Sequence, residues 1–180
     1  MSPQDKYQLA IKFAGKKHRK QRVPGTKLPY VVHLSNVAME VLLASQHSQK
    51  FDLEFALQVA LLHDTVEDTK TSRKELKKEF GPSIADAVAA LTKNDKLPKD
   101  GRISDSLRRI RKMPKEVWAV KLADRITNLQ APPSDWTKGK IASYQEDARM
   151  ILKELRGGNI YLEERLEKKI IEYNKYLSKK

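Results

Sequence analysis

The stretch 60–69, which reads ALLHDTVEDT, begins as an apolar helical run and then carries one histidine and three acidic residues within six positions. On an unbroken helix, His63 and Glu67 share one face, and Asp64 and Asp68 share the adjacent face, because each pair is four residues apart. A solvated helix end is the simplest alternative, since acidic residues are common there. However, the helix dipole disfavours negative charge at a C-terminal end, and clustered carboxylates repel one another. A bound metal ion would resolve this conflict.

A second apolar stretch, VWAVKLADRITNLQ at 117–130, has the same character. Asp124 and Asn128 are four residues apart and share a face, and the neighbours of Asp124 are mostly apolar, which suggests a buried carboxylate. The alternative is a surface ion pair between Asp124 and Arg125, but adjacent helical residues face each other poorly.

The four histidines differ in their settings. His33 follows PYVV at a predicted helix start and by itself would be interpreted as structural. His18 lies in the basic run KKHRK and His47 in a polar segment, so we expect both on the surface. The candidate metal ligands are therefore His33, His63, Asp64 and Asp124. Such a mixed nitrogen and oxygen set suits Mn²⁺, Fe²⁺ or Zn²⁺ better than Mg²⁺.

The composition narrows the class of protein. The 180 residues are enough for one domain with a substantial core, which we place at 1–180. The absence of cysteine excludes disulfides, thiolate metal sites and cysteine nucleophiles. We find no apolar run of about 18 residues and no signal peptide, so we expect a cytoplasmic protein without a membrane span.

The net charge of +13 favours anionic partners. A solvated basic surface is the alternative. No zinc-finger spacing, aromatic-interleaved basic stripe or RNA-binding sheet motif supports a nucleic-acid partner, so we expect none.

Apolar residues recur at helical spacing almost throughout, which predicts an all-α fold. We expect a loop at RVPGTKLPY, a mobile loop at 94–104, Thr71 or Ser72 as a helix cap, and a new helix at Pro82 after Gly81. The expected helices with two predicted ends cover about 3–19, 53–64, 104–112, 137–155 and 160–178. Four more are expected to begin near 33, after 72, at 82 and at 114.

The motifs LPYVVH, ALLHDTVEDT, FGPSIADAVAALTK and VKLADRITNL together resemble those of the HD-domain phosphohydrolases. The resemblance is closest to the hydrolase domain of RelA/SpoT alarmone enzymes, and especially to the small stand-alone alarmone hydrolases of the metazoan SpoT type. It covers roughly residues 5–175. It implies a globular bundle of about eight to ten helices around one metal ion, usually Mn²⁺.

The resemblance also implies roles for individual residues. The metal ligands would be His33, His63, Asp64 and Asp124, and the catalytic residues Glu67, Asp68 and Asn128. The implied reaction removes the 3′-pyrophosphate of ppGpp or pppGpp and leaves GDP or GTP. The chain has no room for the synthetase or regulatory domains of long RelA/SpoT proteins, so we expect degradation alone.

Substrate recognition departs from the family pattern. Val23 stands where the family places an arginine against the guanine base, and Arg22 or Lys27 is the candidate replacement. Lys93 is a candidate phosphate contact near the predicted mobile loop, as are Lys96, Lys99 and Arg102. Tyr144 matches a tyrosine near the nucleotide, with core packing as the alternative.

Two other functions stay open at this point. The departure at Val23 suggests another phosphorylated nucleotide, such as a deoxynucleotide or NADPH. The net charge suggests a non-catalytic nucleotide-binding or nucleic-acid-binding protein, although the intact ligand set argues against it. The oligomeric state is not indicated.

Overall fold

The computed structural model describes residues 1–178, and its regular elements over that part of the chain are all helices. Nine of them have eight residues or more, while α4 and α11 are single turns of four residues. In chain order they are α1 (Pro3–Lys17), α2 (Val31–Ser45), α3 (Leu53–Leu62), α4 (Thr65–Asp68), α5 (Arg73–Phe80), α6 (Pro82–Leu91), α7 (Lys99–Ile110), α8 (Lys115–Asn128), α9 (Lys138–Glu154), α10 (Ile160–Tyr173) and α11 (Lys175–Ser178). The predicted all-α fold is confirmed.

Helix boundaries follow the capping signals of the sequence. Of the two predicted caps for α5, Ser72 is the one used, and its hydroxyl accepts a hydrogen bond from the backbone N–H of Glu75. Gly81 ends α5 with a φ of 87°, a conformation that glycine adopts easily. Pro82 then opens α6, where its missing N–H costs nothing.

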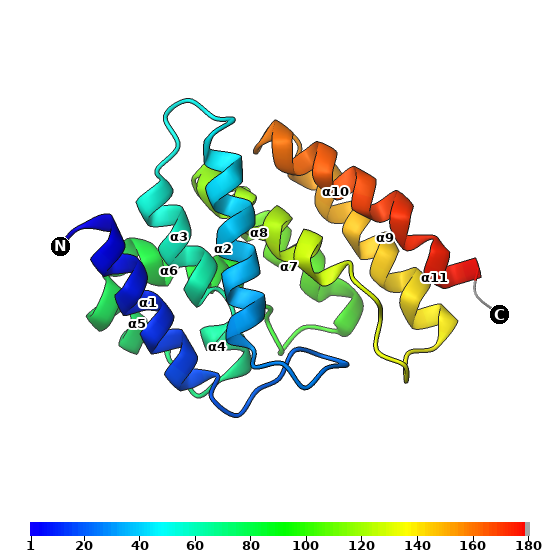
Figure 1. The fold of residues 1–180 in the computed structure, drawn as a ribbon, viewed down its shortest axis with the longest axis horizontal. Coiled ribbons are helices and arrows are strands. Elements are labelled where there is room, and N and C mark those ends of the chain that lie inside the picture. The colour runs from blue at the N-terminus through cyan, green and yellow to red at the C-terminus, as the bar shows by residue number, and fades with distance from the viewer. Residues whose placement is uncertain (179–180) are drawn as a thin grey trace.

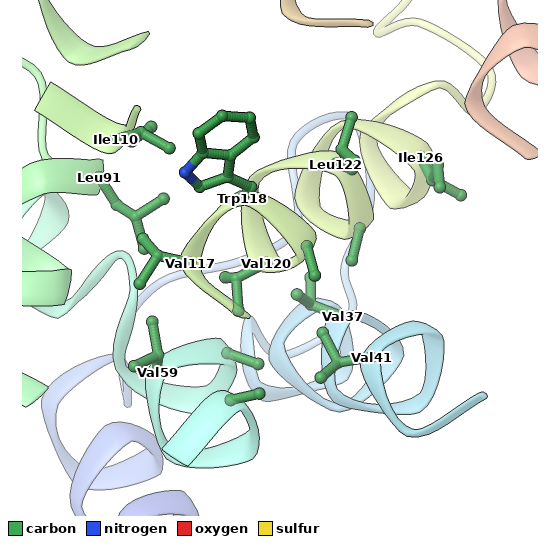
Figure 2. Packing of buried hydrophobic residues seen from close by; sticks show 14 of the residues in the cluster. Val37, Val41, Val59, Leu91, Ile110, Val117, Trp118, Val120, Leu122 and Ile126 are labelled. Atoms are coloured by element: carbon green, nitrogen blue, oxygen red, sulfur yellow. The ribbon is translucent and has the colours of Figure 1, made fainter. Parts of the chain in front are cut away.

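Helix α8 lies at the centre of the molecule and packs against α2, α3, α6, α9 and α10. Figure 1 shows α1 and α5 on one side of this centre and the α9–α10 pair on the other. In Figure 2, Val117 and Val120 of α8 lie among Val59 of α3 and Val37 and Val41 of α2. This packing brings together α2, the end of α3 and α8, which carry all the predicted metal ligands.

The predicted mobile loop 94–104 is wrong over its second half, because α7 begins at Lys99. Gly101 and the surrounding polar residues suggested a loop. However, Leu107 and Ile110 bury one face of α7, and this packing outweighs the low helix propensity of a single glycine. The Arg102 guanidinium also donates to the carbonyl oxygen of Leu97, which ties the remaining loop to the helix.

Among the described residues, no helix combines the length and the apolar character that crossing a membrane requires.

Candidate active site

Four side chains that are distant in the sequence meet at one point. His33 extends from the first turn of α2, His63 and Asp64 follow the end of α3, and Asp124 lies on α8. One candidate ligand atom from each residue lies within 4.8 Å of the other three. The shortest distances join His63 Nε2 to Asp64 Oδ2 (2.9 Å) and His33 Nε2 to Asp124 Oδ1 (3.4 Å). The structure therefore brings together the four predicted ligands; we call them the His–Asp cluster.

The helix that carries the opening motif is interrupted at His63 and Asp64, so the unbroken helix assumed from the sequence is wrong. Helix α3 ends at Leu62, and Asp64, with φ −97° and ψ −2°, separates it from the single turn α4. The Thr65 hydroxyl donates to the Leu62 carbonyl oxygen at 2.6 Å, a side-chain bond that competes with regular helical pairing. Glu67 and Asp68 consequently lie on a separate turn beyond the end of α3.

The outer nitrogens of both imidazoles are held by hydrogen bonds that set the ring tautomer. His63 Nδ1 donates to the Ala60 carbonyl oxygen at 2.7 Å. The Thr127 hydroxyl donates to the Asp124 carbonyl oxygen, so its oxygen accepts from His33 Nδ1 at 3.3 Å. We therefore assign the proton to Nδ1 in each neutral ring, which leaves both Nε2 lone pairs directed into the cluster.

This arrangement fits a divalent metal ion. The Nε2 atoms of His33 and His63 are buried without a hydrogen-bond partner among the described residues, and they face the oxygens of Asp64 and Asp124. Burial acts to lower the pKa of His63, but the negative charges of Asp64 and Asp124 act to raise it, and the net effect is a pKa well above its ordinary value. A metal cation would take the place of the proton that the cluster otherwise attracts.

Two residues on the same helix hold Asp124. Lys121 Nζ lies 3.0 Å from Asp124 Oδ2, and the Asn128 amide donates to Oδ1 at 2.6 Å. Burial acts to raise the pKa of Asp124, but the Lys121 charge and the adjacent imidazoles of His33 and His63 lower that pKa well below its usual range. Asp124 is therefore ionised, and Asn128 contacts a predicted ligand directly.

Glu67 is paired with Lys93, which follows the end of α6. Lys93 donates to both carboxylate oxygens, through Nζ to Oε1 at 2.6 Å and through its backbone N–H to Oε2 at 2.9 Å. Burial acts to lower the pKa of Lys93, but the charge and hydrogen bond of Glu67, together with the charges of Asp124 and Asp64, raise it. Lys93, a predicted substrate contact, is thus a charged residue beside one of the two predicted catalytic acids.

Asp68 is tied to the segment after α1 by a chain of hydrogen bonds. Gln21 Nε2 donates to Asp68 Oδ2 at 2.8 Å, and Gln21 Oε1 accepts from His18 Nδ1 at 2.6 Å. Burial and then the negative charge of Asp64 raise the pKa of Asp68. Gln21 engages one carboxylate oxygen and leaves the other available.

The predicted surface position of His18 is wrong, because His18 is only 3% exposed. Its ring stacks on Tyr30, with centroids 4.9 Å apart, and the Tyr30 hydroxyl donates to Asp64 Oδ2 at 2.5 Å. Charged neighbours suggested solvent, but at the C-terminal end of α1 one position can turn inward while its neighbour Arg19 stays exposed. His47 is exposed, as predicted.

A cavity of about 180 Å³ adjoins the His–Asp cluster, with His33 and Asn128 in its wall. Tyr144 and Trp136 also line it and pack edge to face with ring centroids 5.0 Å apart. The guanidinium of buried Arg125 lies 4.2 Å from the centroid of the Tyr144 ring. Aromatic rings beside polar groups are suited to a planar base, so packing and ligand contact are compatible roles for Tyr144.

The loop after α1 contributes Val23, but not Arg22 or Lys27, to the wall of this cavity. Arg22 and Lys27 are exposed, and the Arg22 side chain donates to the neighbouring Gln21 carbonyl oxygen at 3.4 Å. Their predicted roles in substrate binding therefore stay predictions.

The sequence reasoning assigned no role in the site to several residues that contact it. They are His18, Gln21, Tyr30, Lys121 and Trp136. Gln21 directly precedes the RVPGTKLPY stretch and Tyr30 is its last residue, so hydrogen-bonding side chains at the two ends of a loop were the available signal.

Comparisons with known proteins agree with this geometry. The family model of the HD domain matches residues 10–151. The guanosine-3′,5′-bis(diphosphate) 3′-pyrophosphohydrolase MESH1 of Danio rerio is 35% identical over 167 residues, 90% of this chain and 91% of that protein. The human protein of the same name is 34% identical over 163 residues, 88% of this chain and 89% of its own length.

A solved structure described as a metazoan orthologue of SpoT that hydrolyses ppGpp superposes with a TM-score of 0.82. It is 31% identical and covers 93% of this chain and 94% of its own. With the HD-domain match over most of its length, and relatives of similar length that share about a third of its residues, the chain belongs to the HD-domain family, alongside the MESH1 proteins.

Proposed function

We propose that the protein is a metal-dependent pyrophosphohydrolase that converts ppGpp to GDP, or pppGpp to GTP, with release of pyrophosphate. The observation that carries this proposal is the convergence of the four residues of the His–Asp cluster, with Glu67 and Asp68 on the adjoining turn. The similarity to MESH1 proteins over nearly their whole length supports the choice of substrate.

The ligands in this proposal are His33, His63, Asp64 and Asp124, and the ion is Mn²⁺, with Fe²⁺ and Zn²⁺ as alternatives. Two imidazole nitrogens with carboxylate oxygens favour these ions over Mg²⁺, which prefers oxygen alone. Such an ion would supply Lewis acidity toward the phosphate oxygens and the attacking water.

Asp68 is the better placed of the two acids to accept a proton from water. Its pKa is raised by burial and by the Asp64 charge, and a raised pKa makes a carboxylate a stronger base. Glu67 is already engaged by Lys93 through two hydrogen bonds. We therefore assign proton transfer to Asp68. Glu67 positions Lys93, whose ammonium offsets negative charge that develops on the phosphate.

Asn128 and the aromatic cavity would orient the nucleotide. One N–H of the Asn128 amide donates to Asp124, and the amide also borders the cavity, where its second N–H can meet a phosphate oxygen. Tyr144 and Trp136 supply the faces against which a base packs.

A second candidate function rests on Val23. An aliphatic side chain lines the cavity where the family pattern places an arginine, and it offers no hydrogen bond to a guanine base. The same centre would then act on another nucleotide, such as a deoxynucleotide or NADPH.

Product analysis tests the proposal. The Mn²⁺-loaded protein is offered ppGpp, NADPH, dGTP and GTP in separate reactions, and pyrophosphate is separated from orthophosphate, with Asp64→Ala as the control. Metal-dependent release of GDP and pyrophosphate from ppGpp is the expected result. Orthophosphate from another nucleotide, with ppGpp untouched, would support the second function instead.

A further inference from the structure

A basic groove of about 680 Å³ opens beside Asp68. Its wall is built by the C-terminal end of α1, the segment that follows it and the residues after α4. Four of its cations are Lys16, Arg19, Lys20 and Lys70, and Asp68 is its one acidic lining residue. We call it the Asp68 groove.

The cations of the Asp68 groove are mostly unpaired. Lys17, a fifth cation in the wall, binds Glu75 with 2.7 Å between Nζ and Oε1. Within residues 1–178, none of the other four cations has a carboxylate oxygen within the 4.0 Å of an ion pair. Gathering like charges without counter-charges is unfavourable unless solvent or a bound anion offsets the repulsion.

A second basic groove, between α7 and α9, is more fully neutralised, although within residues 1–178 its lysines Lys112 and Lys153 have no ion pair. Its arginines are Arg108, Arg111 and Arg149, and each lies within ion-pair distance of a carboxylate: Asp105, Glu154 and Glu146, respectively. A groove on this highly charged protein can therefore still have most of its arginine charges neutralised by nearby carboxylates. The difference marks the Asp68 groove as a place where an anion would be stabilised.

The position of this groove limits what the anion can be. Asp68 and Gln21 belong both to the active site and to the wall of the groove, whereas the aromatic cavity meets the His–Asp cluster at His33 and Asn128. No described residue lines both spaces. A nucleotide with its base in the cavity and a phosphate at the cluster can direct a second anionic group into the groove.

We propose that the Asp68 groove binds a diphosphate group of the nucleotide, an inference that rests on the proposed pyrophosphohydrolase function. The four unpaired cations match the several negative charges of a diphosphate, and lysine and arginine are strong donors to phosphate oxygens. In ppGpp the group is either the 3′-diphosphate, which departs, or the 5′-diphosphate, which stays on the nucleoside.

The two sources differ in their place in the reaction. Water oxygen forms a bond to the phosphorus attached to O3′, and the bond between that phosphorus and O3′ breaks. O3′ leaves with the electron pair and takes up one proton, so ppGpp and water give GDP and pyrophosphate. A groove for the 3′-group would hold the departing pyrophosphate, while a groove for the 5′-group would hold GDP.

Binding of inorganic pyrophosphate to the full-length, Mn²⁺-loaded protein is the first test, measured by calorimetry at physiological salt. The double variant Lys16→Glu/Lys70→Glu should weaken binding by about tenfold or more, since it removes two charged contacts and adds two repulsions. The matched control is Lys112→Glu/Lys153→Glu, which makes the same change in net charge at the other groove. Equal weakening in both variants, or none in either, would overturn the proposal.

Turnover of three nucleotides identifies which diphosphate is bound. They are ppGpp, guanosine 5′-monophosphate 3′-diphosphate and guanosine 5′-diphosphate 3′-monophosphate. If the groove holds the 3′-group, the groove variant should lose kcat/KM on the first two and spare the third. If it holds the 5′-group, the variant should lose kcat/KM on the first and third and spare the second.

An equal loss on all three nucleotides, or no loss, would reject a diphosphate site. If the wild-type protein turns over none of them, the proposed function fails, and the pyrophosphate titration still decides whether the groove is an anion site.

Discussion

The buried carboxylate of Glu40 and the two carboxylates of the His–Asp cluster differ in how they are neutralised. Glu40 on α2 is 8% exposed, and Arg165 of α10 donates to both of its oxygens, with 2.6 Å from Nε to Oε2 and 2.5 Å from Nη2 to Oε1. Asp64 and Asp124 instead face two imidazole nitrogens that have no hydrogen-bond partner. The Glu40 carboxylate is satisfied by a planar guanidinium. The two cluster carboxylates have polar partners as well, Tyr30 for Asp64 and Lys121 with Asn128 for Asp124, but the two imidazole Nε2 lone pairs that face them have none among the described residues.

This difference separates a self-contained ion pair from a cluster that is open to a cation. Burying a carboxylate is costly unless a cation and hydrogen bonds compensate it. The Glu40–Arg165 pair contains its own compensation. The His–Asp cluster requires a proton or a metal ion to complete it, so its properties should depend on what is added to the solution. The predictions below test this contrast, beginning with the largest expected effect.

Asp64→Ala should remove nearly all activity. We expect kcat/KM on ppGpp to fall by more than about a hundredfold, since losing even an outer partner of a metal ligand costs 10–100-fold. Mn²⁺ at a hundred times its Kd should stabilise the wild type by about 2.7 kcal/mol and the variant by far less. Kinetics and thermal unfolding with and without Mn²⁺ measure both effects.

The matched control for Asp64→Ala is Glu40→Gln, which should retain the response to Mn²⁺. The contrast would be broken if Asp64→Ala kept metal-dependent turnover, or if Glu40→Gln lost it.

Asp68→Asn should lower kcat on ppGpp by about a hundredfold, the usual scale for a general base, with little change in KM. Asn retains an oxygen that can accept from Gln21 but cannot take a proton from water. The acidic limb of the wild-type pH profile, along which kcat rises as Asp68 loses its proton, should disappear. An unchanged limb would assign the base to another residue, with Glu67→Gln as the next variant.

Glu40→Gln should lower the free energy of unfolding by about 1–2 kcal/mol, less than for a fully buried pair because part of the Arg165 side chain reaches solvent. Activity should stay near that of the wild type. Denaturant unfolding measures the loss, and Glu40→Met/Arg165→Met should restore most of it, because an apolar pair leaves no unpaired charge. A double variant less stable than the single one would show that the ion pair itself is favourable.

His18→Asn should change the pH dependence of stability. Burial lowers the pKa of His18 in the folded protein. Below about pH 6.5 the unfolded chain therefore binds a proton at His18 more readily than the folded protein does. Stability from this residue is therefore complete above about pH 6.5 and is lost as the pH falls toward the folded pKa. Asn keeps a donor for Gln21 but does not titrate, so the loss of stability below about pH 6.5 should be smaller. Urea unfolding at several pH values measures the free energy of unfolding. If that free energy changed with pH in the variant as it does in the wild type, His18 would not be the residue responsible.

The sequence alone identified the all-α class, the residues of the His–Asp cluster and the family. The fold class could be predicted because the spacing of apolar residues shows which face of each helix is buried. The cluster residues could be predicted because His63, Asp64 and Asp124 are polar residues in apolar segments, where burial is costly unless a bound ion compensates it. The cap of α5, predicted at Thr71 or Ser72, and the start of α6 at Pro82 were likewise local, since a cap needs only its own next three residues.

Tertiary structure decided the rest. Whether His18 faces solvent depends on Tyr30, twelve residues away, and whether Asp68 is held depends on Gln21, forty-seven residues away. The break after α3 depends on a hydroxyl competing with the backbone, and the start of α7 on a face that its neighbours bury. Local pattern specifies which residues are polar or apolar, but the partner of each charge is set by contacts that exist only after the chain has folded.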